Sequence, residues 1–487
     1  MRYNLKTKLF AEEIIAADKI VFAAADKDLT WSELKLLHDK ICECLKKSNI
    51  SKGSPVLIYG DKEAFFLASI LACYNMNLTF IPLSPALPKK RIEKIIEQTQ
   101  SKVLINCRGY TDIPKAVVII GEDLRPLPSP PPQGREILRS EISYILFTSG
   151  SSGEPKGVKI SDENIISFTQ WFAKNFHVGE KTVFINQADF SFDISLADFF
   201  GALHTGGTAI FNTSETSSNT NLFFERINKF KGTYWNSTPS FVIRCLADKN
   251  FNVQNLPSIE QFVLSGENLS TQLVKDLKLR FPKAKIVNAY GPTETTIYAS
   301  YAEVTDDLLK ENTLPICKVD DSNISLKDGE IIISGNTVGL GYLNNEALTK
   351  ERFVVSESKT SFLTGDLALV KNGYIYFNGR KDEQIKFNGY RIELNEIKHA
   401  LEKIEFVTRA ECIPIVIENK IKRLIAFVKL SLTPPSPKES ALIQDILITE
   451  LPHYMIPSEI IIVKEFPVTT SFKIDKQKLL RDYLIEG

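Results

Sequence analysis

LFTSGSSGEPKGV, at residues 146–158, is the most informative stretch of this chain. It follows an apolar run at residues 142–147 that predicts a buried strand. Glycines let backbone N–H groups turn toward an anion, hydroxyls donate hydrogen bonds to phosphate oxygens, and a lysine supplies positive charge. The loop therefore predicts a polyphosphate site, although a flexible Gly/Ser turn explains it equally well when it is taken alone. It is neither a P-loop nor a Gly-x-Gly-x-x-Gly fingerprint, because neither spacing is present.

Length and composition indicate an ordinary globular protein. The chain has 487 residues, of which 43% are hydrophobic and 24% charged, so two or three domains with ample core are expected. Lysine plus arginine equals aspartate plus glutamate at 59 each, which gives no overall field toward nucleic acid or an anionic membrane. The seven cysteines and five histidines are scattered and form no C-x-x-C pair. We therefore expect no zinc site or disulfide framework, no nucleic-acid partner and a cytoplasmic location.

One uncharged stretch, residues 64–88, has the composition of a membrane span. It also holds two asparagines and three prolines, which favour a buried helix followed by a strand and an extended loop. The N-terminus carries acidic residues at Glu12 and Glu13 before any apolar core, so no signal peptide is expected. We expect no membrane insertion.

Helical and strand patterns alternate in the first part of the chain, which predicts α/β layers with largely parallel sheets. A proline-rich segment at residues 126–132 is interpreted as a semi-rigid connector before the glycine loop. Beyond the loop, Ser161 is the expected N-cap of a helix with acidic residues in its first turn. The clearest early patterns are helices at 31–46 and 91–99 and strands at 55–59 and 102–106.

From about Gly329 the chain becomes rich in short β patterns, and a compact α+β pattern follows Arg380. We therefore expect two domains, at residues 1–381 and 382–487. The predicted strands are 330–334, 374–378, 384–386, 411–417, 422–430 and 459–464, and the predicted helices are 394–403 and 441–451.

Several further blocks follow the glycine loop in a fixed order. They are FSFDIS (190–195), NAYGPTETT (288–296), GLGYLN (339–344), FLTGDL (362–367), GRKDEQIK (379–386), GYRIE (389–393) and FKID (472–475). With the loop, this set resembles the adenylate-forming superfamily of acyl-CoA synthetases, luciferases and amino-acid adenylation domains, from about Leu29 to Lys476. The resemblance implies a large N-terminal domain of layered α/β sheets with a small β-barrel-like part, and a small mobile α+β C-terminal domain.

The resemblance implies ATP-driven activation of a carboxylate in two half-reactions. The carboxylate attacks the α-phosphate of ATP to give acyl-AMP and pyrophosphate, and a thiol then displaces AMP. Such a step needs charge neutralised around the phosphorus and both reactants held in register. The phosphate-binding residues implied are Thr148, Ser149, Gly150, Ser151, Ser152, Gly153 and Lys156, and the nucleotide-binding residues are Asn288, Ala289, Tyr290, Gly291, Pro292, Thr293, Asp366, Phe377 and Arg380.

Some of these residues carry specific roles in the resemblance. Tyr290 offers an aromatic face to adenine, Thr293 a hydroxyl to the α-phosphate, and Asp366 accepts from the ribose hydroxyls. Glu294 is the expected Mg²⁺ ligand, because magnesium takes few carboxylates and relies on phosphate oxygens. Phe377 stands where such enzymes often carry a tyrosine, which removes one hydroxyl and keeps the packing.

Two residues are expected to serve the domain movement between half-reactions. Lys473 is similar to the lysine that bridges the substrate carboxylate and the α-phosphate during adenylation. The Asn-Gly that usually precedes it is replaced by Ser471-Phe472, so the local turn departs from the family pattern. Asp382 occupies the hinge position, and residues after it are expected to open a pantetheine tunnel for the second step.

Asp193 indicates which acid is activated. Amino-acid-activating members carry an aspartate here that pairs with the substrate α-ammonium, whereas a buried carboxylate facing an uncharged acyl chain would be costly. A turn residue is the alternative interpretation. The expected side-chain pocket is mixed and selects no single amino acid: Ile194, Ala197, Ser237, Val263, Ser265, Ala289, Ile297 and Tyr298.

Three functions follow from these observations. The first is a stand-alone amino-acid ligase that transfers the aminoacyl group to the phosphopantetheine thiol of a separate carrier protein. It is similar to D-alanine–carrier protein ligases and to nonribosomal peptide synthetase adenylation domains, and D-alanine is one candidate substrate. The second is an acyl- or aryl-acid:CoA ligase, and the third is a catalytically impaired nucleotide-binding homologue.

Overall fold

The computed structural model describes residues 16–48, 50–108, 118–120, 142–150, 153–311, 313–321, 323–356, 359–417, 420–431, 437–468 and 474–486. The chain forms two compact units. The first unit comprises residues 1–85, 95–147 and 157–382, and the second comprises residues 86–94, 148–156 and 383–487. The glycine loop thus belongs to the same unit as the C-terminal part of the chain, and the proline-rich segment 126–132 lies outside the described residues.

The largest sheet of the first unit has eight strands in the order β14-β13-β12-β11-β9-β10-β1-β2. The strands from β13 to β1 are parallel, and the two edge strands are antiparallel to their neighbours. The strands are β1 (Ile20–Ala23), β2 (Asp28–Thr30), β9 (Val183–Asn186), β10 (Thr208–Phe211), β11 (Tyr234–Ser237), β12 (Gln261–Leu264), β13 (Lys285–Tyr290) and β14 (Ser300–Glu303).

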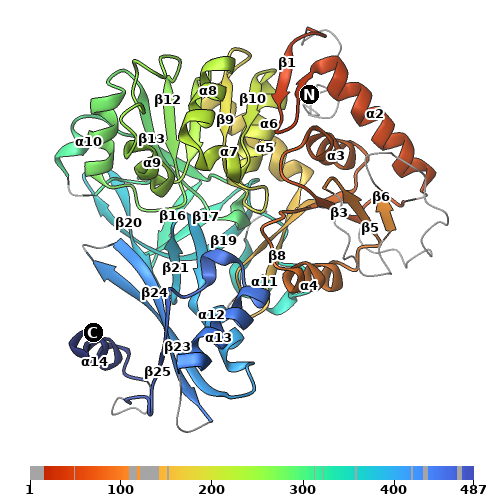
Figure 1. Cartoon of the computed structure of the whole chain (residues 1–487). Helices are drawn as coiled ribbons and strands as arrows, with labels where there is room; N and C mark the ends of the chain where they lie inside the picture. The colour runs from red at the N-terminus through yellow and green to blue at the C-terminus, as the bar shows by residue number, and fades with distance from the viewer. Residues whose placement is uncertain are drawn as a thin grey trace. The chain divides into compact units, whose positions relative to one another are not determined.

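Helices cover this sheet because their apolar faces pack on its strands. In Figure 1, α9 and α10 lie beside β12 and β13, and their side chains join one apolar cluster with those strands. Helix α5 begins with a capping box. The Ser161 side chain accepts from the backbone N–H of Asn164, and the Asn164 side chain accepts from the backbone N–H of Ser161, so the predicted N-cap is confirmed. The helices near this sheet are α5 (Asp162–Asn175), α6 (Ile194–Thr205), α7 (Ser214–Ser218), α8 (Thr220–Phe230), α9 (Pro239–Leu246) and α10 (Thr271–Arg280), with short η1 (Thr293–Thr295) and η2 (Leu308–Lys310).

A second sheet of six strands follows the order β6-β5-β3-β4-β7-β8. Helix α3 (Ala64–Asn75) packs on β3 and β4 and is buried from Ala64 to Tyr74, so the uncharged stretch is a buried helix followed by a strand, as predicted. The strands are β3 (Pro55–Tyr59), β4 (Thr79–Leu83), β5 (Val103–Asn106), β6 (Val118–Ile120), β7 (Ile142–Thr148) and β8 (Lys156–Ser161), and the flanking helices are α2 (Trp31–Lys47) and α4 (Lys89–Thr99).

A third sheet forms the β-rich part that the sequence predicts before residue 382. Its strands are antiparallel in the order β15-β20-β19-β17-β16, and β18 pairs with β19. The elements are β15 (Cys317–Lys318), β16 (Ile324–Lys327), β17 (Glu330–Ser334), α11 (Glu346–Arg352), β18 (Phe353–Ser356), β19 (Lys359–Lys371) and β20 (Tyr374–Arg380).

The C-terminal segment of the second unit is a small α+β arrangement. Helices α12 and α13 pack on β23 and β25, and Ile397, Leu401 and Ile443 are fully buried in its core. The elements are β21 (Gln384–Phe387), β22 (Tyr390–Glu393), α12 (Leu394–Glu402), β23 (Val407–Ile417), β24 (Lys420–Leu430), α13 (Pro437–Glu450), η3 (His453–Met455), β25 (Glu459–Ile462) and α14 (Lys476–Glu486). The predicted helices and strands in this part are confirmed, with ends shifted by up to four residues.

Candidate functional site

The glycine loop joins β7 to β8 and is held by its own backbone. The Gly153 N–H donates to the Gly150 carbonyl at 3.0 Å, and the Thr148 hydroxyl donates to the Lys156 carbonyl at 3.5 Å. A Cβ at Gly150 would overlap the carbonyl oxygen of Glu154, so only glycine fits this turn. Ser151 and Ser152 lie outside the described residues.

Carboxylates from the start of α12 contact the groups that the sequence predicts to hold phosphate. The Gly150 N–H donates to Glu396 Oε2 at 2.9 Å, and Lys156 Nζ lies 3.2 Å from Glu393 Oε1. The Ser149 hydroxyl donates to the Arg391 carbonyl at 2.9 Å. In this conformation the loop therefore binds anionic oxygens through a backbone amide and a lysine, which is the chemistry expected for phosphates.

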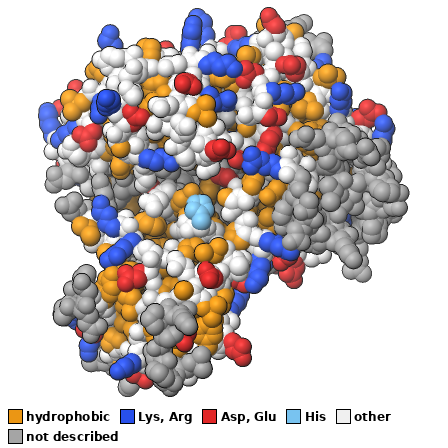
Figure 2. All heavy atoms as spheres, in the orientation of Figure 1, with side chains coloured by type: hydrophobic (Ala, Val, Ile, Leu, Met, Phe, Trp, Pro, Cys, Tyr) orange, Lys and Arg blue, Asp and Glu red, His pale blue; other side chains and the backbone are white. Residues whose placement is uncertain are grey.

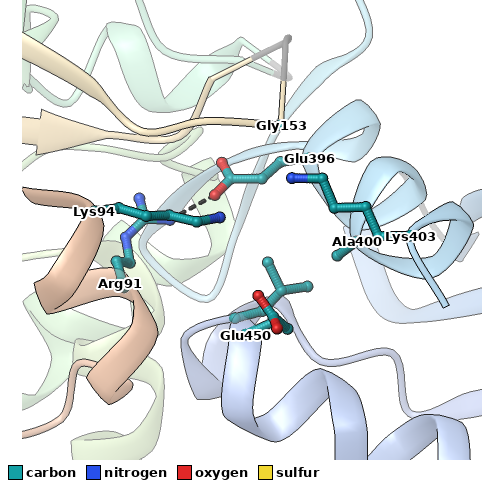
Figure 3. Close-up of a pocket in the computed structure, with 8 residues that line it drawn as sticks. Arg91, Lys94, Gly153, Glu396, Ala400, Lys403 and Glu450 are labelled. Atoms are coloured by element: carbon teal, nitrogen blue, oxygen red, sulfur yellow. Dashed lines mark hydrogen bonds and ion pairs between the residues drawn. The ribbon is translucent and has the colours of Figure 1, made fainter. Parts of the chain in front are cut away.

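Glu396 also forms an ion pair with Arg91, whose side chain is 4% exposed against 2% for Glu396. Figure 3 shows these two side chains pointing toward each other beside a small pocket, with Gly153 above them. The pocket is lined by Arg91, Lys94, Gly153, Glu396, Ala400, Lys403, Glu450 and Leu451. Two of the lining residues, Lys94 and Lys403, form ion pairs with the Glu154 carboxylate.

Strand β13 and the turn after it carry the block Asn288 to Glu294 in the first unit. The Tyr290 hydroxyl donates to Asp366 Oδ2 at 2.6 Å, and both side chains are buried. Burial, followed by the nearby Asp366 carboxylate, raises the pKa of Tyr290 well above its usual range. Asn288 Nδ2 donates to the Pro315 carbonyl. A Cβ at Gly291 would lie 2.5 Å from the Ile297 carbonyl oxygen, so this position has no room for a side chain.

Asp366 and Arg380 face each other across β19 and β20 and form an ion pair. Arg380 also donates from Nε and Nη2 to the two carboxylate oxygens of Asp382, at 2.6 and 2.9 Å. This bidentate contact ties the predicted hinge residue to the predicted nucleotide-binding arginine. Phe377, on the same strand, packs against the apolar core.

Glu294 is fully buried in the turn after β13, next to the half-buried Thr293. One of its carboxylate oxygens accepts from the Tyr342 hydroxyl at 2.8 Å. A carboxylate in this position fits a magnesium ion that takes most of its ligands from phosphate and water. Among the described residues, no group of three or more histidine, cysteine, aspartate or glutamate side chains is arranged to hold a metal.

The eight residues predicted to line the acid pocket are all buried, and all of them except Ser237 and Ser265 belong to one apolar core cluster of the first unit. They lie at the carboxyl ends of the neighbouring strands β11, β12 and β13, on α6, which follows β9, and in the turn after β13. Ligands bind at this edge of parallel sheets because loops and helix starts meet there. Asp193 lies in the turn that precedes α6 and is half-buried; its carbonyl accepts from the Leu196 N–H, and its side chain makes no capping hydrogen bond to that helix.

A buried carboxylate that the sequence analysis missed lies on α6, next to the predicted pocket residue Ala197. Asp198 is 1% exposed and accepts from Asn186 Nδ2 at 2.9 Å and from Asn236 Nδ2 at 3.1 Å. Burial raises the pKa of the Asp198 carboxyl to about 8, although both amide hydrogen bonds lower it. Lys62 is also buried, and burial lowers its pKa to about 8. A lone charge in the apolar run of residues 194–205 was the signal that could have revealed Asp198.

Glu393, Glu396 and Arg91 were likewise missed, because their partners lie far away in sequence. Lys473, the predicted adenylation lysine, and the altered Ser471-Phe472 pair lie outside the described residues.

The surface charges, the helix lengths and the cysteines point to no additional site among the described residues. Figure 2 shows basic and acidic side chains interspersed over the described part of the visible face. In the described part of the chain, no helix is both long and apolar enough to cross a membrane. All seven cysteines are buried and free of disulfides.

Comparison with known proteins gives matches over nearly the whole chain. The model of the AMP-binding enzyme family matches residues 15–343, and that of the AMP-binding enzyme C-terminal domain matches residues 396–473. The D-alanine–D-alanyl carrier protein ligase of Bacillus licheniformis is 36% identical, over 96% of this chain and 97% of that protein.

Two solved structures share the fold. The Vibrio cholerae adenylation domain AlmE, in complex with glycyl-adenosine-5'-phosphate, has a TM-score of 0.83 at 20% identity and covers 100% of this chain and 98% of its own. The o-succinylbenzoate CoA synthetase MenE of Bacillus subtilis has a TM-score of 0.81 at 19% identity, with 98% of each chain covered. These likenesses confirm the predicted fold class and, at such identities, say nothing about the substrate.

Proposed function

This chain belongs to the AMP-binding enzyme family, and we propose that it is an ATP-dependent ligase which adenylates an amino acid and transfers it to a carrier-protein thiol. The observation that carries the proposal is the full-length similarity to a D-alanine–D-alanyl carrier protein ligase at 36% identity. Asp193 supports it, because a half-buried carboxylate at the predicted pocket suits a substrate that carries an ammonium group.

The first half-reaction joins the amino-acid carboxylate to the α-phosphate of ATP and releases pyrophosphate. Tyr290 would stack on adenine, while Asp366 would accept from the ribose hydroxyls with its orientation fixed by Tyr290 and Arg380. Thr293 would donate to the α-phosphate. Lys473 would bridge the substrate carboxylate and the α-phosphate, as the family resemblance implies.

The glycine loop would hold the departing pyrophosphate. Its Gly150 amide and the Lys156 ammonium already bind carboxylate oxygens in this conformation, so they have the geometry to bind anions. ATP would have to displace Glu396 and Glu393 from these groups. We expect Ser151 and Ser152 to add hydroxyl donors.

Glu294 would hold a Mg²⁺ ion together with phosphate oxygens, and the ion would neutralise charge on the phosphates. The Tyr342 hydroxyl fixes one oxygen of Glu294, whose side chain is buried. The protein would thus supply a single, oriented oxygen ligand to the ion rather than a full set of metal ligands.

The second half-reaction transfers the aminoacyl group from AMP to a phosphopantetheine thiol on a separate carrier protein. Asp382 would act as the hinge between the two half-reactions, and the Arg380 contact would have to loosen when the hinge turns. The name of the B. licheniformis relative makes D-alanine the first substrate to test.

The decisive experiment is pyrophosphate exchange with the L- and D-amino acids, fatty acids and aryl acids, with and without EDTA. We expect exchange only with an amino acid, and only with magnesium present. Asp193→Asn should abolish it, whereas Asp276→Asn on α10 is a matched control that should not. Exchange driven by fatty or aryl acids would identify an acyl- or aryl-acid:CoA ligase instead, and inactivity with every acid would indicate a catalytically impaired homologue.

A further inference from the structure

A hydrogen-bonded chain links the buried Asp198 to Tyr298, one of the predicted pocket residues. The Tyr298 hydroxyl donates to Asn236 Oδ1 at 2.6 Å, and Asn236 Nδ2 donates to Asp198 Oδ1 at 3.1 Å. Asn186 holds the other carboxylate oxygen of Asp198 at 2.9 Å. Each of these four side chains is no more than 2% exposed, so the hydrogen-bonded chain is buried in the core.

The ring of Tyr298 packs against a cluster of phenylalanines. Phe168, Phe172 and Phe176 present one face of α5 and its C-terminal end to this ring, with centroid separations of 6.1, 6.5 and 6.0 Å. Aromatic pairs at such separations are attractive, so the phenylalanines hold one side of the ring. Tyr298 is therefore clamped between a phenylalanine cluster and an amide–carboxylate pair.

The direction of the hydrogen bonds gives Asn236 a fixed orientation. Its amide nitrogen has two acceptors, Asp198 and the Ile194 carbonyl at 3.2 Å, which leaves its oxygen to accept from Tyr298. Removal of Asp198 would take away one of the two acceptors that set this orientation. The carboxylate thus acts on Tyr298 through the amide, without touching it.

We propose that Asp198 and Asn236 are positioning residues that hold Tyr298 across the side-chain pocket, so that only amino acids with small side chains are activated efficiently. This inference rests on the proposed amino-acid ligase function and deepens it. Tyr298 is the largest residue among the eight predicted to line the pocket, and Ala197 and Ala289 are the smallest. A tyrosine that can swing away would admit larger side chains.

The test is the ratio of kcat/KM for alanine to that for leucine, in pyrophosphate exchange with the enantiomer that the wild type prefers. Both values come from one preparation, so the ratio does not depend on how much of the enzyme is folded. Asp198→Ala and Tyr298→Phe should each lower this ratio at least tenfold. Asp198→Asn keeps an oxygen that can accept from Asn236 and should keep the ratio within threefold of wild type.

Tyr301→Phe is the matched control, since it removes the hydroxyl of a half-buried tyrosine that bonds Asn175 at 3.3 Å. An unchanged ratio in Tyr298→Phe would overturn the proposal even if Asp198→Ala fails to fold, because the phenylalanine keeps the ring and its packing. An equal fall in Asp198→Ala and Asp198→Asn would also overturn it. The wild-type enzyme is measured first. If it shows no exchange with any amino acid, the proposed function itself is refuted and the variants are not compared.

Discussion

Replacing Tyr290 by phenylalanine tests how the nucleotide-binding carboxylate is oriented. The change removes one hydroxyl and keeps the aromatic ring. That hydroxyl donates to Asp366 Oδ2 at 2.6 Å, and Asp366 is 3% exposed, so water cannot replace the lost donor. A hydrogen bond to a charged acceptor contributes about 1.5–3 kcal/mol. Asp366 keeps its ion pair with Arg380, but it loses the partner that fixes its second oxygen.

Two effects are expected from this change. The free energy of unfolding of the first unit should fall by about 2 kcal/mol. The three tryptophans, at positions 31, 171 and 235, all lie in that unit and report its unfolding in urea by fluorescence. The KM for ATP should rise about tenfold, because a loss of about 1.4 kcal/mol in ribose binding is one decade in affinity.

Pyrophosphate exchange measured with ATP and with 2',3'-dideoxy-ATP separates ribose binding from a general loss of structure. The dideoxy nucleotide offers no hydroxyl to Asp366, so Tyr290→Phe should change its KM little. Tyr301→Phe serves again as the control and should leave both KM values near wild type. An equal rise in KM for both nucleotides would refute the reasoning, because the Tyr290 hydroxyl would then act on something other than the contact between Asp366 and the ribose.

Three further predictions concern the loop and the buried charges. Gly150→Ala should reduce exchange at least tenfold, because its Cβ overlaps a loop carbonyl, whereas Gly179→Ala, with open space around it, should not. Glu396→Gln removes the carboxylate opposite buried Arg91, so hydrogen exchange at the Gly150 amide should speed up tenfold or more; an unchanged rate would show that the contact does not hold the loop. Lys62 has its pKa lowered to about 8, so wild-type stability is lost as pH falls from about 10.5 through 8. Urea unfolding at pH 10 and at pH 7 should therefore show that the free energy of unfolding of Lys62→Met, measured relative to wild type, is higher at pH 7 by about 2 kcal/mol. The same difference between the two proteins at both pH values would contradict the assigned pKa of Lys62.

Local elements followed closely from the sequence. Strands at 55–59 and 330–334 were predicted at their observed bounds, and the Ser161 cap needed only its own neighbours to form. Periodicity and caps are read within a few residues, which is why such elements are recoverable without tertiary information. The family resemblance and the fold class rested on sequence motifs whose order along the chain can be read without a structure.

The contacts of the candidate site could not be predicted in the same way. Tyr298 reaches Asn236 across 62 positions and Gly150 reaches Glu396 across 246, so neither pair leaves a local pattern. Whether Asp198 is a solvated helix residue or a buried acceptor depends on which strands flank β11, and strand order is a property of the whole sheet.

The sequence by itself determined the motifs, their order, the fold class and the kind of ligand that the glycine loop suits. Only the tertiary structure decided which groups face each other: Gly150 and Glu396, Tyr290 and Asp366, and Asn236 and Asp198. The physical reason is that side-chain chemistry is local, whereas burial and hydrogen-bond partners are set by packing between segments distant in the chain.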